Sequence, residues 1–239
     1  MGIITIKKLL LIFYFLIGYL LLAEEFENII IKENFENCLV YDFWWESIGN
    51  SGPEGKSFSG VTEKTASPFE NGWKSYEIRI GNGGSLREKY FWMNKPIYLD
   101  LKKGGLFFSF DFMGSDYIEE GGFSFEFLGG DDGWKELFMI GVNRKKITWT
   151  KITGNIVDEI KPFVWYRIEL NFKVDENKLF GNLKLIEYKK DNLIIQKEVV
   201  IPKYFNNLNR LKIAMWRNNE KGHIFSFYID NIQLRVISN

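Results

Sequence analysis

Residues 106–113 read Leu-Phe-Phe-Ser-Phe-Asp-Phe-Met, and this stretch decides the fold class. An apolar side chain recurs in it at every second position, at Leu106, Phe108, Phe110 and Phe112. Successive side chains of a β-strand point to opposite faces, so the pattern predicts a strand with one apolar and one more polar face. Such strands are typical of antiparallel sheets that keep one face in water.

The same two-residue period recurs along most of the chain, in residues 123–127, 165–172, 211–216 and 225–230. Between the runs lie glycine-rich or polar turn segments, at residues 81–84, 103–105, 121–122, 129–133 and 175–178. Turns about ten residues apart suggest a sandwich or a barrel. The chain is also 17% aromatic, with 22 Phe and 8 Trp, which favours strands and large cores. We therefore predict an all-β fold, a two-sheet antiparallel β-sandwich.

The first 23 residues differ from the rest in having no alternation. Lys7 and Lys8 precede an apolar run at residues 9–22, and Ala23 follows it directly before acidic residues. This order predicts a secretory signal peptide at residues 1–23, because the run of 14 residues is short for a membrane span of about 20. Leu21 stands where a small residue is usual, so an uncleaved anchor stays open as an alternative. In either case we expect a secreted, periplasmic or cell-surface protein.

Residues 24–239 show no break in composition, and we expect them to form a single domain. The 31 basic and 31 acidic residues become 29 and 31 without Lys7 and Lys8, which argues against a protein held to nucleic acid by a basic surface. Cys38 is the one cysteine, so no disulfide is expected. With one Cys and one His, His223, a zinc site and a Ser-His-Asp triad are both implausible.

Three short strings together carry a family resemblance: ENFE at 33–36, VWYRIEL at 164–170 and FYIDNIQL at 227–234. The set resembles bacterial extracellular jelly-roll domains of the concanavalin A-like lectin/glucanase type, including the laminin-G-like ones. The terminal pair is also similar to carbohydrate-binding modules with a galactose-binding-like sandwich, which are usually shorter than this chain. The resemblance implies that the first and last strands lie side by side. It also implies a structural calcium ion near that junction, with Glu36 and Asp230 as the acidic candidates.

Two carboxylates, Asp111 and Glu126, are the candidates for catalysis or polar ligand contacts. If their strands pair as a hairpin, both side chains could share one sheet face, as the two acids of a glycoside hydrolase share a cleft. The Glu-x-Asp-x-x-Glu string of the family's glucanases and the Gln-x-His string of its alginate-lyase relatives are both missing. The alternative is that the two carboxylates belong to a hydrated outer face.

Four tryptophans are candidates for stacking on sugar rings: Trp44, Trp45, Trp134 and Trp216. Trp134 follows the glycine-rich segment 129–133, and Trp216 shares its strand phase with Lys212. The alternative for each is a place in the core or at a sheet edge. Asp131 and Asp132 could hold calcium, but a tight turn that joins two strands explains that segment more simply.

The hypothesis that unites these features is an extracellular, non-catalytic domain that binds carbohydrate by aromatic stacking and through a polar sheet face. A second hypothesis is a polysaccharide hydrolase or lyase on the same scaffold. A third is a structural surface protein without a small ligand. Fold alone does not decide between them.

Overall fold

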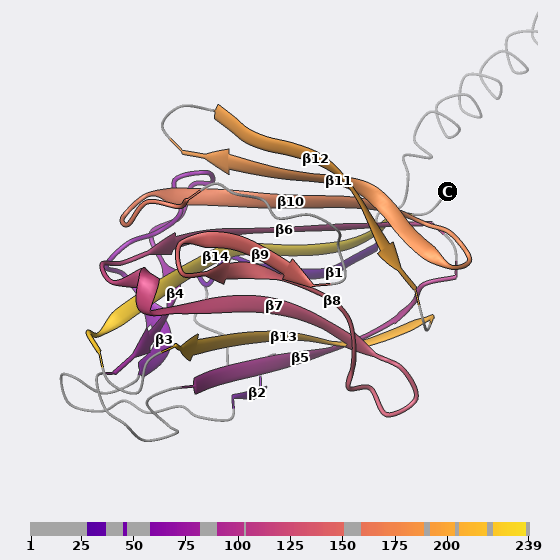
Figure 1. Cartoon of the computed structure of the whole chain (residues 1–239), viewed down its shortest axis with the longest axis horizontal. Helices are drawn as coiled ribbons and strands as arrows, with labels where there is room; N and C mark the ends of the chain where they lie inside the picture. Colours follow the sequence, from indigo (N-terminus) through magenta and orange to yellow (C-terminus); the bar gives the residue numbers. More distant parts are fainter. Residues whose placement is uncertain are drawn as a thin grey trace, which may run out of the picture.

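The computed structural model describes residues 28–36, 45–46, 58–81, 90–102, 104–150, 159–188, 192–203, 206–218 and 222–237. They form two antiparallel sheets packed face to face (Figure 1). Sheet A has eight strands: β12 (Asn192–Pro202), β11 (Lys178–Glu187), β10 (Trp165–Val174), β6 (Gly105–Gly114), β14 (Phe225–Ile237), β4 (Ser75–Ile80) and β3 (Phe58–Thr62) in this order, with β1 (Asn28–Glu33) also on β14. Sheet B has six strands: β2 (Trp45–Glu46), β5 (Tyr90–Asp100), β13 (Asn207–Arg217), β7 (Gly121–Gly129), β8 (Lys135–Asn143) and β9 (Lys146–Thr150). The predicted all-β sandwich is confirmed.

The core between the sheets is built from the alternating phenylalanines. The ring centroids of Phe110 on β6 and Phe125 on β7 lie 4.2 Å apart, and those of Phe108 and Phe127 lie 4.9 Å apart. These rings are fully buried. Removing one such ring to Ala typically costs about 3–5 kcal/mol of stability, so this double row fixes the spacing and register of the two layers.

The expectation that the strands of Asp111 and Glu126 pair as a hairpin is wrong. β6 forms its hydrogen bonds with β10 and β14 in sheet A, whereas β7 pairs with β13 and β8 in sheet B. Residues 115–120, which include the short 3₁₀-helix η1 (Ile118–Glu120), connect the two strands. This connection can span the roughly 10 Å between packed sheets, while hairpin loops usually have two to five residues. The chain therefore crosses from one layer to the other here.

The first and last described strands lie side by side, as the resemblance implies. β1 pairs antiparallel with β14, and Glu33 is opposite Ile232. β14 lies between β6 on one side and both β4 and β1 on the other. The C-terminal strand is therefore inside sheet A, and acidic residues near both ends of the chain come to the same sheet.

The predicted signal peptide at residues 1–23, Cys38 and Trp44 all lie outside the described residues. The leader, its cleavage and the domain boundary at residue 24 stay predictions. In the part of the chain that the structure describes, no helix is both long and apolar enough to span a bilayer.

Candidate functional site

Each sheet has an outer face, which is the face turned away from the other sheet, and the predicted site residues are divided between these two faces. Asp111, on β6, and Asp230, on β14, are register partners in sheet A. Glu126, on β7, is a register partner of Lys212, on β13, in sheet B. Because Phe110 and Phe125 fill the core between them, Asp111 and Glu126 point away from each other. The predicted pair of catalytic carboxylates does not form.

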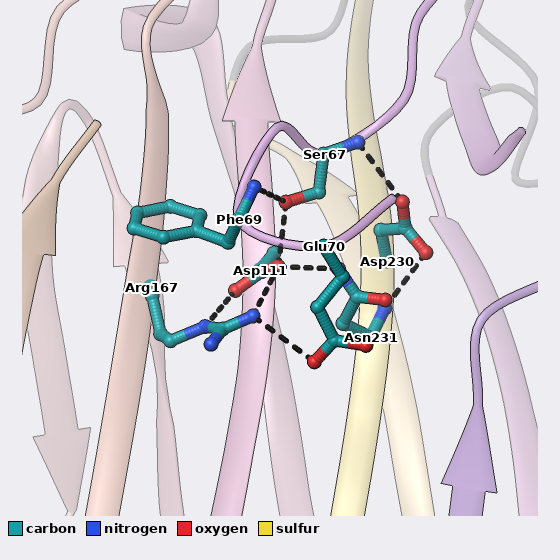
Figure 2. Close-up of polar contacts among 7 residues, drawn as sticks. All are labelled: Ser67, Phe69, Glu70, Asp111, Arg167, Asp230 and Asn231. Atoms are coloured by element: carbon teal, nitrogen blue, oxygen red, sulfur yellow. Dashed lines mark hydrogen bonds and ion pairs between the residues drawn. The ribbon is translucent and has the colours of Figure 1, made fainter. Parts of the chain in front are cut away.

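On sheet A, Asp111 is the centre of a buried polar network (Figure 2). Arg167, opposite it on β10, donates two hydrogen bonds to its carboxylate, from Nε to Oδ1 at 2.6 Å and from Nη2 to Oδ2 at 2.9 Å. The Ser67 hydroxyl and the Asn231 side-chain amide also donate to Oδ2, at 2.5 and 2.6 Å. Asp111 has no exposed surface, so the expectation of a hydrated or ligand-binding carboxylate at this position is wrong.

Residues 63–74, which we call the strap, connect β3 to β4 and cover this part of sheet A, as Figure 2 shows for Ser67, Phe69 and Glu70. The Phe69 ring lies 4.7 Å from the Arg167 guanidinium, and Glu70 forms an ion pair with Arg167 at 3.4 Å. The Trp165 indole donates to the Thr65 hydroxyl at 3.3 Å. The strap therefore closes the outer face of sheet A over β10, β6 and β14.

The two metal candidates, Asp230 and Glu36, both hold the strap. Asp230 accepts the backbone N–H groups of Ser67 and Asn231, at 2.9 and 2.8 Å. Glu36 accepts those of Trp73 and Lys74, at 2.8 and 2.9 Å. Carboxylate oxygens are the right kind of donor for calcium, but two acids supply too few of its six to eight ligands. No group of three or more His, Cys, Asp or Glu side chains among the described residues could hold a metal ion.

Asp230 is the electrostatically unusual member of the network. Its pKa is raised to about 7, mainly by burial and also by the charges of Asp111 and Glu36, while the two backbone hydrogen bonds act to lower it. Asn231 follows in the left-handed region, at φ 47°, where the register of β14 against β6 shifts. Asn tolerates this conformation better than most residues, and the bulge aims its side chain at Asp111. Asp230 and Asn231 therefore lie within a strand and do not end one.

The outer face of sheet B holds Glu126 and Trp216, in rows that cross β13, β7 and β8. The first row is Lys212, Glu126 and Met139, and the second is Ala214, Ser124 and Gly141. Lys212 and Glu126 form an ion pair at 2.9 Å, with side chains 17% and 16% exposed. Ser124 donates a weaker hydrogen bond to Glu126 at 3.3 Å. This face combines charged groups with small central residues.

Trp216 belongs to a third row, opposite Gly122. A Cβ atom on Gly122 would come within 2.8 Å of the Trp216 ring, so the glycine makes room for this half-buried indole. The position of Trp216 in the same strand phase as Lys212 is confirmed. On the far side of β5, Trp45 in β2 is the register partner of Asn94, which is opposite Lys212.

Trp134 lies at the other end of this face. Its ring is 49% exposed, and the Arg210 guanidinium lies over it at 4.1 Å from the ring centroid. Arg210 is two residues before Lys212 on β13. The segment before Trp134 is a tight turn: Gly130 and Gly133 have positive φ values of 80° and 70°, and the Gly133 N–H donates to the Gly130 carbonyl at 3.0 Å.

The fold has clear structural relatives, although a scan against known protein families and a search of curated proteins both gave no match. One relative is the cellulose induced protein Cip1, with a TM-score of 0.52 at 11% identity, covering 85% of this chain and 96% of Cip1. Another is the catalytic domain of a glycoside hydrolase family 131 protein from Coprinopsis cinerea, with a TM-score of 0.53 at 11% identity, covering 86% and 93% of the two chains. The fold is a jelly-roll β-sandwich like that of these two proteins. Identities this low establish the fold alone.

Two residues of this jelly roll that sequence reasoning missed are Arg210 and Tyr98. Extending the alternation of residues 211–216 backwards by one residue would have placed Arg210 on the same face as Lys212. Tyr98 is 80% exposed, because the register of β5 against β13 shifts between Pro96 and Leu99. Pro96 was the available signal, since proline inside a strand marks an edge or a bulge.

Proposed function

We propose that this protein is an extracellular carbohydrate-binding domain and that it binds glycans on the outer face of sheet B. The observation that carries the proposal is the exposed ring of Trp134, held against Arg210 on a fixed turn at the end of this face. An aromatic ring held in place can stack on the apolar face of a sugar without losing much conformational freedom on binding. Structural relatives that act on carbohydrates, such as the glycoside hydrolase family 131 protein from Coprinopsis cinerea, support the proposal by analogy.

The proposed binding surface follows β13. Arg210, Lys212, Ala214 and Trp216 share one strand phase, and six residues of strand span about 20 Å. That length is sufficient for several sugar units of a chain. Trp134 and Arg210 would contact one end of the glycan and Trp216 the other, while Lys212 and Glu126 would order hydroxyl groups between them.

Binding without catalysis is favoured over hydrolysis because the acids are separated. Glycoside hydrolases that use two carboxylates hold them about 5–9.5 Å apart across the sugar. Asp111 is on the other sheet, and the register neighbours of Glu126 are Lys212 and Met139, neither of which is a carboxylate. Glu126 is also ion-paired with Lys212.

The test is affinity electrophoresis against a panel of polysaccharides, with an assay for new reducing ends in parallel. We expect retention on at least one polysaccharide and no new reducing ends. Trp134→Ala should lose retention, while Trp73→Ala serves as the matched control, because Trp73 is a 76% exposed tryptophan on the strap of sheet A. If the migration of the protein is unchanged by every polysaccharide, the proposal is overturned. New reducing ends would favour the hypothesis of a polysaccharide hydrolase or lyase.

Secretion and calcium binding are separate proposals. Mass spectrometry of the exported protein should find an N-terminus at Glu24. Calcium held by Glu36 and Asp230 is supported by charge, because a divalent cation would relieve the repulsion from Asp111 and Glu36 that adds to burial in raising the pKa of Asp230. We expect a higher melting temperature in 1 mM CaCl₂ than in 1 mM EDTA, and Asp230→Asn should lose the difference. Equal melting temperatures for the wild-type protein overturn the calcium proposal.

A further inference from the structure

We propose that the outer face of sheet B prefers anionic glycans whose sugars have a carboxylate, and that Arg210 binds this carboxylate. The inference rests on the proposed function and names the ligand class of the same surface. It starts from a contrast between Arg210 and two arginines of the described strands that are paired with carboxylates.

The two paired arginines are Arg167 and Arg217, and each lies within hydrogen-bond distance of its carboxylate partner. Arg167 forms two hydrogen bonds with Asp111, at 2.6 and 2.9 Å. Arg217 donates to Glu120 at 2.7 Å, with a side chain that is fully buried. Arg210 is half-buried, yet it forms no hydrogen bond or ion pair with any residue in the described ranges. Its recorded contact is with the face of the Trp134 ring.

This contact leaves the hydrogen-bonding edge of the guanidinium without a partner among the residues that the structure describes. Arginine has five N–H donors in the plane of the group, and an aromatic ring that lies against the guanidinium face uses none of them. A carboxylate matches two of these donors in a bidentate pair, whereas a sugar hydroxyl accepts one bond and has no charge. The chemistry of the guanidinium edge therefore favours an acidic sugar over a neutral one.

The ring and the guanidinium are held in place by the turn before Trp134. The Gly130 carbonyl accepts hydrogen bonds from the side-chain amides of Asn207 and Asn209, at 3.1 and 3.3 Å. The Trp134 N–H donates to Asp132 Oδ1 at 3.0 Å. Since Asn207 and Asn209 lie three residues and one residue before Arg210 on β13, these bonds tie the turn before Trp134 to the strand that has the arginine. Such a preorganised pair loses little freedom when a ligand binds.

Tyr98 supplies a second ring near this arginine. The register shift leaves Ile97 and Tyr98 of β5 opposite Asn209, directly beside the pairing of Pro96 with Arg210. Tyr98 is 80% exposed and has a φ of 48°, a conformation in which bulky residues are rare and which concentrates at functional sites. Arg210 thus lies between two exposed aromatic residues, Tyr98 and Trp134, that could stack on the sugars flanking a bound carboxylate.

Two charged groups near Arg210 are already engaged in other contacts. Lys212, two residues along the strand, is neutralised by Glu126 at 2.9 Å. Asp132, in the turn before Trp134, accepts the Trp134 N–H and forms no ion pair with Arg210.

The experiment compares polygalacturonate, alginate and hyaluronan, each against its own carboxyl-reduced form, by affinity electrophoresis and by titration calorimetry with oligosaccharides of the best ligand. We expect at least ten-fold tighter binding of one acidic polymer than of its reduced form. Arg210→Gln should abolish that preference, and Arg210→Lys should restore only part of it, because lysine keeps the charge without the bidentate edge. Lys184→Gln is the matched control, since it removes an exposed cation from sheet A and should leave the preference unchanged. Circular dichroism checks that each variant is folded.

The outcomes separate the inference from the proposed function. If the protein binds neutral polymers as tightly as acidic ones and Arg210→Gln changes neither affinity, the inference is overturned. Carbohydrate binding itself would still stand. Equal losses in Arg210→Gln and Lys184→Gln also overturn it, because they would show attraction by net charge only. Binding to no polysaccharide at all overturns both.

Discussion

Each outer face of the sandwich has a cross-strand pair of a cation and a carboxylate, but the two pairs differ in their exposure to solvent. On sheet A, Arg167 and Asp111 form a cross-strand pair of cation and carboxylate, and on sheet B, Lys212 and Glu126 form another. The strap covers the first pair, and Asp111 has no exposed surface. The second pair keeps 17% and 16% of its side-chain surfaces in contact with solvent. Burial, and not residue type, decides which charges hold the fold and which can meet a ligand.

The contrast extends to the tryptophans of the two faces. Trp165, on sheet A, is buried and its indole N–H is bonded to Thr65 of the strap. Trp134, beside sheet B, is half exposed and lies against an arginine whose N–H groups have no partner among the described residues. The closed face uses its polar groups to fix a loop. The face with Trp134 leaves polar and aromatic groups available, which is what recognition of a sugar requires.

The largest change in stability is expected from breaking the polar network around Asp111, under the strap on sheet A. Asp111→Asn removes the charge that Arg167 needs and disturbs the bonds from Ser67 and Asn231. Breaking a buried ion pair by removing one partner typically costs about 3–5 kcal/mol, and the lower end applies because Arg167 remains 19% exposed. Urea denaturation would measure the loss. A loss below about 1 kcal/mol would contradict the view that this network anchors the strap.

A second test of the closed face uses pH. Because the pKa of Asp230 is about 7 in the folded state and ordinarily 3.8, the folded protein binds a proton between these values that the unfolded chain has released. The contribution of Asp230 to stability is therefore highest below about pH 4 and falls as pH rises to about 7, by a few kcal/mol at most. Asp230→Asn should flatten this part of the pH profile of the unfolding free energy, measured in EDTA from pH 5 to 8. A variant profile parallel to that of the wild-type protein would contradict the assignment.

How far the sequence predicts these faces depends on the range of the interactions involved. Alternation in residues 106–112 is local, and it correctly predicted a strand with phenylalanines on the core side. Strand pairing is not local, and nothing in the spacing of Asp111 and Glu126 shows that β6 and β7 belong to different sheets. The position of Trp134 after a glycine-rich turn was also a local signal, and the structure places its ring at the surface.

The strap shows why the rest could not be predicted. Ser67 and Asp230 are 163 residues apart, and their contact forms only because β14 lies between β6 and β4. Without that topology, Asp111 looks like any polar residue on the wet face of a strand. Arg210 was missed for the opposite reason, because a single arginine in an alternating strand looks like a solvated charge until the Trp134 ring is placed beside it.

On the face of sheet B, Trp134→Ala should change binding much more than stability. We expect affinity for the preferred polysaccharide to fall about ten-fold, equivalent to about 1.4 kcal/mol, because a stacking ring is lost. The unfolding free energy should fall by only about 0.5–1 kcal/mol, the usual contribution of an exposed cation–π contact such as that with Arg210. Calorimetry and urea denaturation of the same preparation measure both. An unchanged affinity would show that the glycan does not bind at this end of sheet B.

The smallest effect is expected from Glu126→Gln, the counterpart on sheet B of the change at Asp111. Glutamine keeps the shape and still accepts a hydrogen bond, and the ion pair that it loses is partly solvated, so about 0.2–1 kcal/mol of stability should be lost. If charge on this face serves recognition, the same variant removes the carboxylate beside Lys212 and should strengthen binding of an acidic polysaccharide relative to binding of its carboxyl-reduced form. A stability loss as large as that of Asp111→Asn would show that both faces are structural, and the difference between them would no longer point to a binding surface.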